Sequence, residues 1–179
     1  QYLDMGKEDN PFMGFRAIRY CLENQQLFRT QLRALLRANT AGNIRRRLPM
    51  VTELQEIRDV RKRIDESVEE LKAEGKEFGQ NISLGIMVET PAAAATADIL
   101  AEEVDFFSIG TNDLTGYMMS TDRGNGKVAY LYSVYQPAVL RMIRNVCEAA
   151  HKAGIPVGMC GEAAADPALI QCLLGFGLD

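Results

Sequence analysis

The sequence repeats a unit in which a short, continuous apolar run ends in a polar turn and a helical segment follows. Apolar runs of this kind cover residues 48–51, 82–88, 104–109 and 155–159. A strand with one face in water would alternate apolar and polar residues, so these runs predict strands that are buried on both faces. The repeated strand, turn and helix therefore predict a parallel sheet with helices outside it.

The segments between the strands carry helical patterns, over residues 14–41, 52–75 and 91–103. Residues 1–13 are polar and contain glycine and proline, so they predict a loop or linker, with the domain itself over residues 14–179. A chain of 179 residues can form one domain with a substantial core. Two parallel architectures remain open at this point, a doubly wound sheet and a (β/α)8 barrel, and both place chemistry at the carboxyl ends of the strands.

Composition and charge exclude several classes of protein. The net charge of −4 and the pI of about 5.2 argue against a nucleic-acid-binding surface. No apolar run reaches the length of a membrane span, so no membrane association is expected. The cysteines form no CxxC pair, and the sequence is typical of a reduced, cytoplasmic protein. The basic run Arg45-Arg46-Arg47 is interpreted as a solvated helix or loop face, with phosphate steering as the alternative.

Carboxylates follow two of the predicted strands. Glu89 ends one strand, and Asn112 and Asp113 end the next. Carboxylate and amide oxygens suit a hard divalent cation such as Mg²⁺ or Mn²⁺, which takes further ligands from water and from a phosphorylated substrate. The alternative is that both carboxylates cap the helices that follow them.

Two arginines and one cysteine are further candidates. Arg16 follows Gly14 and Phe15, and Arg123 lies in a predicted loop before Gly124. A guanidinium at either position could bind phosphate or carboxylate, or could simply be solvated. Cys160 lies between glycines at a strand end, where it could be a packing residue or a thiol that transfers a proton. His151 lies in a helical pattern that predicts a surface position, so it is not expected to accept a phosphoryl group.

Five ordered motifs resemble one known family. They are NPFMGFRA from residue 10, GIMVETPA from residue 85, DFFSIGTNDLT from residue 105, DRGN from residue 122 and GMCGE from residue 158. The sequence resembles the Enzyme I family, the phosphoenolpyruvate-protein phosphotransferases of bacterial sugar phosphotransferase systems, over their C-terminal domain, which binds phosphoenolpyruvate (PEP). The resemblance implies a (β/α)8 barrel of which this chain supplies roughly strands 4 to 7.

The resemblance also implies roles for the candidate residues. Glu89 and Asp113 would ligate Mg²⁺, and Asn112 would contact the substrate phosphate. Arg16 and Arg123 would bind PEP, while Cys160 would protonate the enolate carbon and so yield pyruvate. The phosphorylated histidine would lie in an N-terminal domain outside this chain, the next phosphoacceptor would be the carrier protein HPr, and the enzyme would form a homodimer.

Two alternatives accompany this interpretation. Pyruvate phosphate dikinases and phosphoenolpyruvate synthases share a similar barrel with GTND and CGE motifs, although the segments at residues 14–17 and 89–92 favour the Enzyme I family. A non-catalytic dimerisation module is the other. Because half a barrel leaves strand edges and apolar surface uncovered, we expect the isolated chain to associate and to turn over little or no PEP.

Overall fold

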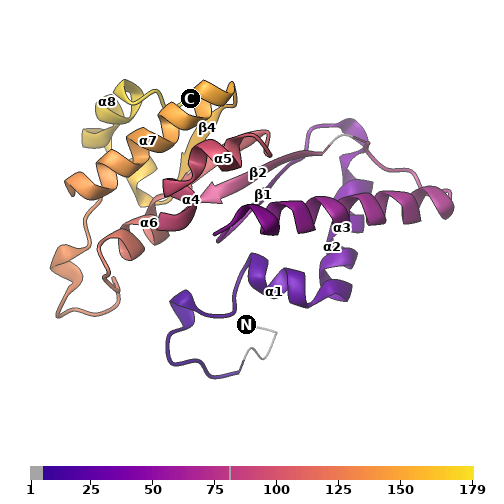
Figure 1. Ribbon diagram of the computed structural model, residues 1–179, viewed down its shortest axis with the longest axis horizontal. Coiled ribbons are helices and arrows are strands. Elements are labelled where there is room, and N and C mark those ends of the chain that lie inside the picture. Colours follow the sequence, from indigo (N-terminus) through magenta and orange to yellow (C-terminus); the bar gives the residue numbers. More distant parts are fainter. Residues whose placement is uncertain (1–5, 81) are drawn as a thin grey trace. The chain divides into compact units, whose positions relative to one another are not determined.

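The structure, a computed structural model that describes residues 6–80 and 82–179, contains a parallel sheet of four strands. The strands are β1 (Arg45–Leu48), β2 (Ser83–Val88), β3 (Phe106–Gly110) and β4 (Val157–Cys160), and each pairs in parallel with the next (Figure 1). A doubly wound sheet changes direction at a switch point, whereas each strand of a (β/α)8 barrel lies beside its successor. The order β1-β2-β3-β4 is the barrel order, and the predicted parallel α/β fold is confirmed.

Eight α-helices and four short 3-10 helices accompany the strands in the described residues. The α-helices are α1 (Ile18–Glu23), α2 (Gln25–Ala38), α3 (Leu54–Ala73), α4 (Pro91–Ala95), α5 (Ala97–Ala101), α6 (Thr111–Met118), α7 (Pro137–Ala153) and α8 (Pro167–Gly175). The 3-10 helices are η1 (Pro11–Met13), η2 (Asn39–Ala41), η3 (Ala129–Leu131) and η4 (Glu162–Ala165). Two of the predicted helices are interrupted, the first at Asn24 and the third at Thr96.

The chain divides into two compact units, residues 1–44 with 58–82 and residues 45–57 with 83–179. In the first unit, ion pairs join α2 to α3 and to the residue that follows α3, from Arg29 to Glu70 and from Arg33 to Glu74, each at 2.6 Å. These side chains are partly exposed, so the pairs contribute modestly to stability. The linker predicted for residues 1–13 stays a prediction, and residues 1–5 lie outside the described residues.

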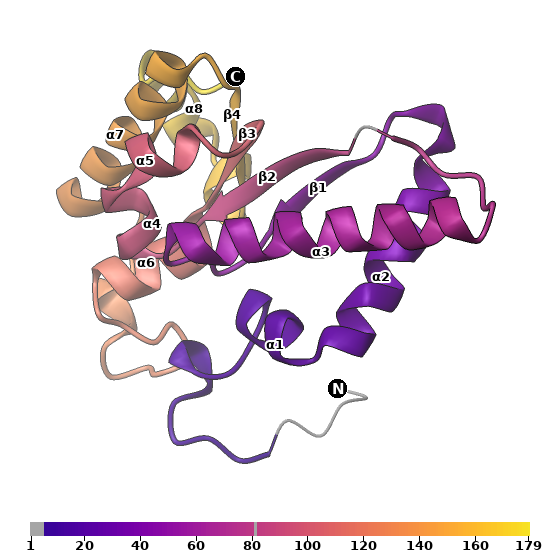
Figure 2. The ribbon, with the colours of Figure 1, turned by 45° about the vertical axis from the view of Figure 1, so that its right-hand side comes forward.

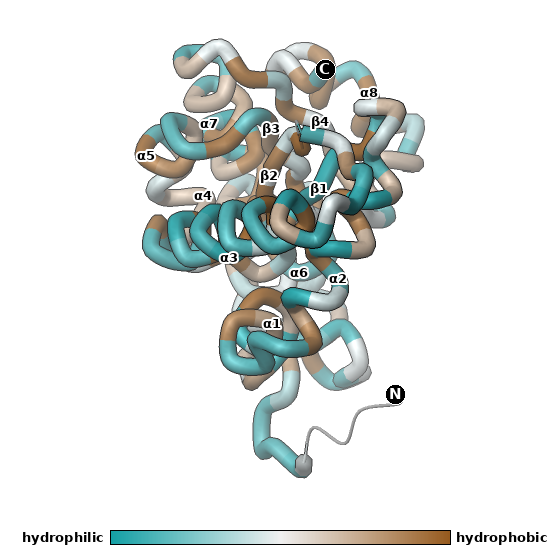
Figure 3. Tube along the Cα trace, turned by 90° about the vertical axis from the view of Figure 1, so that its right-hand side faces the viewer, coloured by the Kyte–Doolittle hydropathy of each residue, from teal (hydrophilic) through white to brown (hydrophobic). Residues whose placement is uncertain are grey.

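The second unit contains the whole sheet. One face of the sheet is covered by helices, and α7 packs against α5 and against β3 and β4 (Figure 2). One row across this face consists of Leu48, Ile86, Phe107 and Val157, which are register partners and are almost completely buried. Figure 3 colours the chain by hydropathy and shows that β2 is mainly hydrophobic, whereas α3 is mainly hydrophilic. Burial of this face supplies the main stabilisation of the unit.

The position of β1 differs from the sequence-based expectation. A strand was expected over residues 48–51, but β1 is Arg45–Leu48, and Met50 has a φ of 58°, which ends the extended conformation. The expectation of a solvated helix or loop for the arginine run is therefore wrong. The strand alternates exposed Arg45 and Arg47 with buried Arg46 and Leu48. The guanidinium of Arg45 lies 5.9 Å from the centre of the Phe106 ring, so it keeps favourable contacts within the sheet.

No helix in the described part of the chain is long and apolar enough to cross a membrane.

Candidate active site

Strand β3 passes directly into a helix at the carboxyl edge of the sheet. Gly110 is the last residue of β3 and the N-cap of α6, and Thr111 is the first residue of that helix. Asn112 and Asp113 consequently lie in the first helical turn, above the end of the strand. Carboxyl ends of parallel strands are the usual location of active sites in barrels, and the structure places both polar residues there.

Asn112 connects two strand ends through its side chain. Its Oδ1 accepts a hydrogen bond of 3.1 Å from the backbone N–H of Glu162, which follows β4. Its backbone oxygen accepts a second bond, of 2.9 Å, from the hydroxyl of Tyr132. Burial raises the pKa of that tyrosine above its ordinary value, so its hydroxyl stays protonated and can donate. Asn112 is thus held in one orientation by donors from two other segments.

A close backbone approach joins the same two strand ends. The hydroxyl of Thr111 donates a hydrogen bond of 3.1 Å to the backbone oxygen of Cys160. Gly161 has a φ of 99°, and a Cβ at this position would lie 2.4 Å from Thr111 Oγ1. Only glycine accommodates both the conformation and the contact. The glycine after Cys160 therefore allows the cysteine to approach the start of α6.

Cys160 is half-buried on the face of the sheet that is opposite to the helix-covered face. Its sulfur accepts a hydrogen bond of 3.5 Å from the hydroxyl of Ser108, a buried residue of β3. Ser108 Oγ in turn accepts a bond of 2.9 Å from Nη1 of Arg47 on β1. The thiol is therefore not in an apolar pocket, and a hydroxyl group contacts it directly.

Glu89 is almost fully buried, with 2% of its surface exposed, at the end of β2. Its Oε1 accepts a hydrogen bond of 2.7 Å from the backbone N–H of Met50, beyond the end of β1. The capping alternative is wrong for this residue, because Thr90 is the N-cap of α4 and its hydroxyl accepts from Ala93 N at 3.1 Å. Gly110 leaves room for the carboxylate, since a Cβ there would lie 2.5 Å from Glu89 Oε2.

The oxygen-donor set fits a hard divalent cation in its chemistry. No group of three or more His, Cys, Asp and Glu side chains within residues 6–80 and 82–179 could hold a metal ion. Mg²⁺ commonly keeps several waters and binds one or two carboxylates together with substrate phosphate oxygens. Glu89 and Asp113 supply two carboxylates at adjacent strand ends, which suits such a partial protein site. Asp113 is the third residue of α6 and is not its N-cap, which is Gly110.

The two candidate arginines belong to different units. Arg123 lies in the loop after α6, and its Nη1 is 3.6 Å from Glu162 Oε1, so it reaches the segment that holds Asn112. Arg16 belongs to the first unit, where its Nη1 donates to the backbone oxygen of Phe12 at 3.4 Å. Within the second unit, the structure therefore brings Arg123 into the neighbourhood of Asn112 through Glu162.

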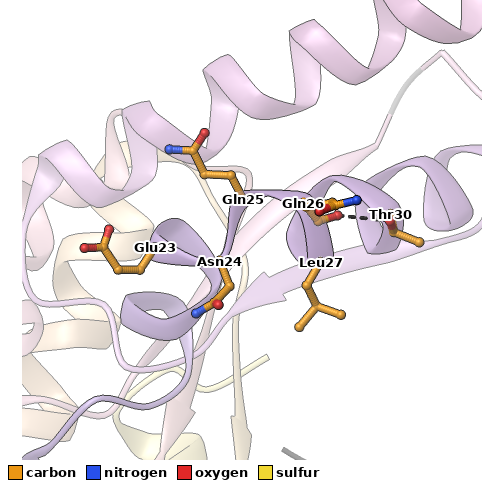
Figure 4. A pocket seen from close by; sticks show the side chains of 6 residues that line it. All are labelled: Glu23, Asn24, Gln25, Gln26, Leu27 and Thr30. Atoms are coloured by element: carbon orange, nitrogen blue, oxygen red, sulfur yellow. Dashed lines mark hydrogen bonds between the residues drawn. The ribbon is translucent and has the colours of Figure 1, made fainter.

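Two surface hollows lie in different units of the chain. One, of about 300 Å³, is lined by residues around Asn112, Tyr132 and Glu162, and thus lies beside the joint between α6 and η4. The other, of about 600 Å³, lies in the first unit at the junction of α1 and α2 (Figure 4). Its lining side chains are mostly polar, and none of them is a candidate site residue. The first hollow is therefore the one adjacent to the candidate site.

Sequence reasoning singled out neither Ser108 and Tyr132, which contact candidate residues, nor Arg47, which contacts Ser108. Arg47 was interpreted only as part of a basic run, and Ser108 and Tyr132 were not considered. Ser108 lies two residues before Gly110, so period-two counting along the strand would have placed it on the face of the strand-end glycine. No local pattern predicts the contact from Tyr132 to Asn112, because they come from separate segments.

Comparison with known proteins identifies the family of this chain. The family described as PEP-utilising enzyme, PEP-binding domain, matches residues 1–179. The phosphoenolpyruvate-protein phosphotransferases of Geobacillus stearothermophilus, Staphylococcus carnosus and Bacillus subtilis are 56%, 54% and 54% identical over 178 residues. Each alignment covers 99% of this chain and 31% of the relative, so the chain spans about a third of the relatives' length.

A solved structure supports the fold. A HpcH/HpaI aldolase/citrate lyase family protein from Burkholderia cenocepacia J2315 matches with a TM-score of 0.51 and 15% identity, over 78% of this chain and 59% of the other. At that identity the likeness concerns the fold alone. The full-length match to the family, together with the polar residues at the carboxyl edge of the sheet, shows that this chain belongs to the PEP-utilising enzymes, as their PEP-binding domain.

Proposed function

We propose that this chain forms the PEP-binding part of a phosphoenolpyruvate-protein phosphotransferase. The intact enzyme would transfer the phosphoryl group of PEP to its own histidine, in a domain outside this chain, and release pyruvate. The observation that carries the proposal is the bond from Glu162 N to Asn112 Oδ1, at 3.1 Å. It holds the ends of β3 and β4 together, so that an amide, a carboxylate and a thiol share one edge of the sheet.

The residues at the carboxyl edge of the sheet would have different roles in the reaction. Asn112 would contact the phosphate through its amide N–H groups, because its Oδ1 is already engaged by Glu162. Arg123, on the loop beside Glu162, would offset the negative charge of the phosphoryl group. Arg16 is also proposed to bind PEP. Cys160 would give its proton to the methylene carbon of the enolate that remains when the phosphoryl group leaves.

Glu89 and Asp113 would hold the divalent cation, which we propose to be Mg²⁺. When bound, the ion would neutralise charge that develops on the transferring phosphoryl group. Two contacts of Glu89 support this role: Met50 N–H donates to Oε1, and Oε2 lies where a side chain at residue 110 would clash with it. Asp113 is half-buried in the first turn of α6, where the positive end of the helix dipole favours a carboxylate.

Partners and location follow from the same proposal. The substrate would be PEP, the first protein partner would be the histidine-bearing domain of the same enzyme, and the second would be HPr. The intact enzyme would act in the cytoplasm as a homodimer.

Calorimetry on the full-length protein tests the proposal. Wild type should bind PEP only in the presence of Mg²⁺, and Asp113→Ala should lose this binding. Asp98→Ala is a matched control, because Asp98 is an exposed carboxylate in the first turn of α5. PEP binding that persists in Asp113→Ala at the wild-type affinity would contradict the metal assignment.

A further inference from the structure

Three residues form a chain of hydrogen bonds across the face of the sheet opposite to the one on which α7 packs. Arg47 Nη1 donates to Ser108 Oγ at 2.9 Å, and Ser108 Oγ donates to Cys160 Sγ at 3.5 Å. The residues come from β1, β3 and β4, and each of the two hydrogen bonds joins two different strands. None of them is a neighbour of another in the sequence.

Strand register explains how the chain of bonds crosses the sheet. Arg47 pairs with Gly85, and Gly85 pairs with Phe106, so Arg47 lies in one row with Phe106. Ser108 is one row nearer the carboxyl edge on the same face, and Cys160 is one row further, paired with Gly110. Strands are spaced by about 4.8 Å, so Ser108 is about 10 Å from β1, which an extended arginine side chain can span.

The chemistry of the three groups gives the bonds a direction. A guanidinium can only donate, so Ser108 Oγ must act as the acceptor of Arg47. The single hydroxyl hydrogen of Ser108 is then available to the sulfur of Cys160. A hydroxyl that is polarised by a cation is a stronger donor, and donors of this kind favour an anionic acceptor over a neutral one.

We propose that Arg47 is a positioning residue that acts through Ser108 to stabilise the thiolate of Cys160. This inference rests on the proposed function, in which the S–H bond breaks, the proton passes to the methylene carbon, and the electron pair stays on sulfur. Pyruvate leaves, and solvent returns a proton to the thiolate. The Arg47 and Ser108 pair lowers the free energy of the state in which sulfur carries the charge.

Other charged groups near this edge are separate from the chain of bonds. Glu162 follows Cys160 by two residues and is 3.6 Å from Arg123, so those two charges offset each other. Glu89 is directed toward Met50 N and the Gly110 backbone. Asp113 lies in the first turn of α6. Arg47 is connected to the thiol through Ser108, by two hydrogen bonds between described strands.

The first test measures the reactivity of the thiol. Full-length protein is treated with iodoacetamide at about pH 8, and the modified cysteines are located by mass spectrometry. Arg47→Met and Ser108→Ala should each slow the alkylation of Cys160 by about 3- to 10-fold, because thiolate is the reactive form. Arg47→Lys, which keeps a cationic donor, should recover part of the rate. Arg45→Met is the control, since Arg45 lies on the same face but contacts Phe106.

The second test separates positioning from substrate binding. Arg47→Met should lower kcat for pyruvate formation by about tenfold and leave KM for PEP within about twofold of wild type. Unchanged alkylation of Cys160 in Arg47→Met would overturn the proposal, and so would a raised KM with unchanged kcat, which would mean direct contact with the substrate. If wild type forms no pyruvate, the proposed function fails, while alkylation still decides whether Arg47 acts on Cys160.

Discussion

The side chain of Asn112 and the backbone of Glu162 are joined by a hydrogen bond of 3.1 Å, although the two residues are separated by 50 positions in the chain. This bond connects the first turn of α6 to the segment that follows β4. It fixes the amide of Asn112, so that the oxygen faces Glu162 and the N–H groups remain for another acceptor. The same residue thus has a structural bond and a proposed contact with phosphate.

Replacing Asn112 by alanine should affect binding more than stability. The Glu162 N–H is in an exposed segment and can bond to water instead, so we expect a loss of about 1 kcal/mol in the free energy of unfolding. PEP affinity should fall at least about tenfold, because the amide contact with phosphate is lost. Thermal unfolding and calorimetric titration of the full-length protein measure the two effects.

Asn24→Ala is the control for that variant, because Asn24 also makes a bond to the backbone, from Nδ2 to Tyr20 O at 3.0 Å, but lies in the first unit. It should lose a similar amount of stability and keep its affinity for PEP. Equal loss of PEP affinity in both variants would show that the effect comes from general destabilisation.

Gly161→Ala should destabilise the protein by about 2–4 kcal/mol. The residue has a φ of 99°, and the new Cβ would lie 2.4 Å from Thr111 Oγ1, so both the backbone and the neighbouring hydroxyl would have to shift. Gly158→Ala, in β4 just before Gly161, is the control, since its Cβ would meet nothing within 4 Å. Urea unfolding of the two variants should give clearly different midpoints. Similar midpoints would show that the approach of β4 to α6 tolerates a side chain.

Glu89→Gln separates the charge of Glu89 from its structural hydrogen bond. The amide oxygen of glutamine can still accept from Met50 N, so the unfolding midpoint should change little. Mg²⁺ affinity should fall at least about tenfold, because a neutral ligand replaces a carboxylate. Glu102→Gln, at an exposed position, should bind Mg²⁺ as wild type does. Titration calorimetry measures the Mg²⁺ affinity of each variant. An unchanged affinity in Glu89→Gln would exclude Glu89 as a ligand.

The sequence predicted the strands that consist of apolar residues. The strands near residues 82–88, 104–109 and 155–159 lie within two residues of β2, β3 and β4, because double burial requires continuous apolar side chains. Strand β1 precedes the predicted strand over residues 48–51, because its arginines can lie in a sheet when they have tertiary partners. Arg47 donates to Ser108, and Arg45 contacts the ring of Phe106. Propensity and local pattern contain no information on such partners.

The residues of the candidate site could be predicted from the sequence, but the contacts that orient them could not. Polar residues at strand ends were recognisable along the chain, and the structure places Asn112 and Cys160 on adjoining strand ends. The bonds that orient them come from Glu162, Tyr132 and Ser108, each of which is distant in sequence from its acceptor. Those contacts depend on the register of the sheet, which a single sequence does not state.

The cysteines should differ in reactivity according to their burial. Burial raises the pKa of the Cys147 thiol from 9.0 to about 11, with smaller contributions from Asp179 and Glu148. At about pH 8 only about one molecule in a thousand would therefore carry the thiolate at Cys147, so this residue should resist iodoacetamide in the native protein. Half-buried Cys160 should be modified before Cys147.

The raised pKa of Cys147 also predicts how stability depends on pH. A thiol whose folded pKa lies above its unfolded value stabilises the fold fully below about pH 9, and this contribution is lost as the pH rises toward about 11. Cys147→Ala should therefore lose less stability over that interval than wild type does, which chemical unfolding at both ends of the interval measures.

Peptide mapping tests whether burial protects the Cys147 thiol. Cys147 should become labelled at about pH 8 only when urea unfolds the protein. Labelling of native Cys147 at the rate of Cys160 would mean that α7 opens readily and that burial does not protect the thiol.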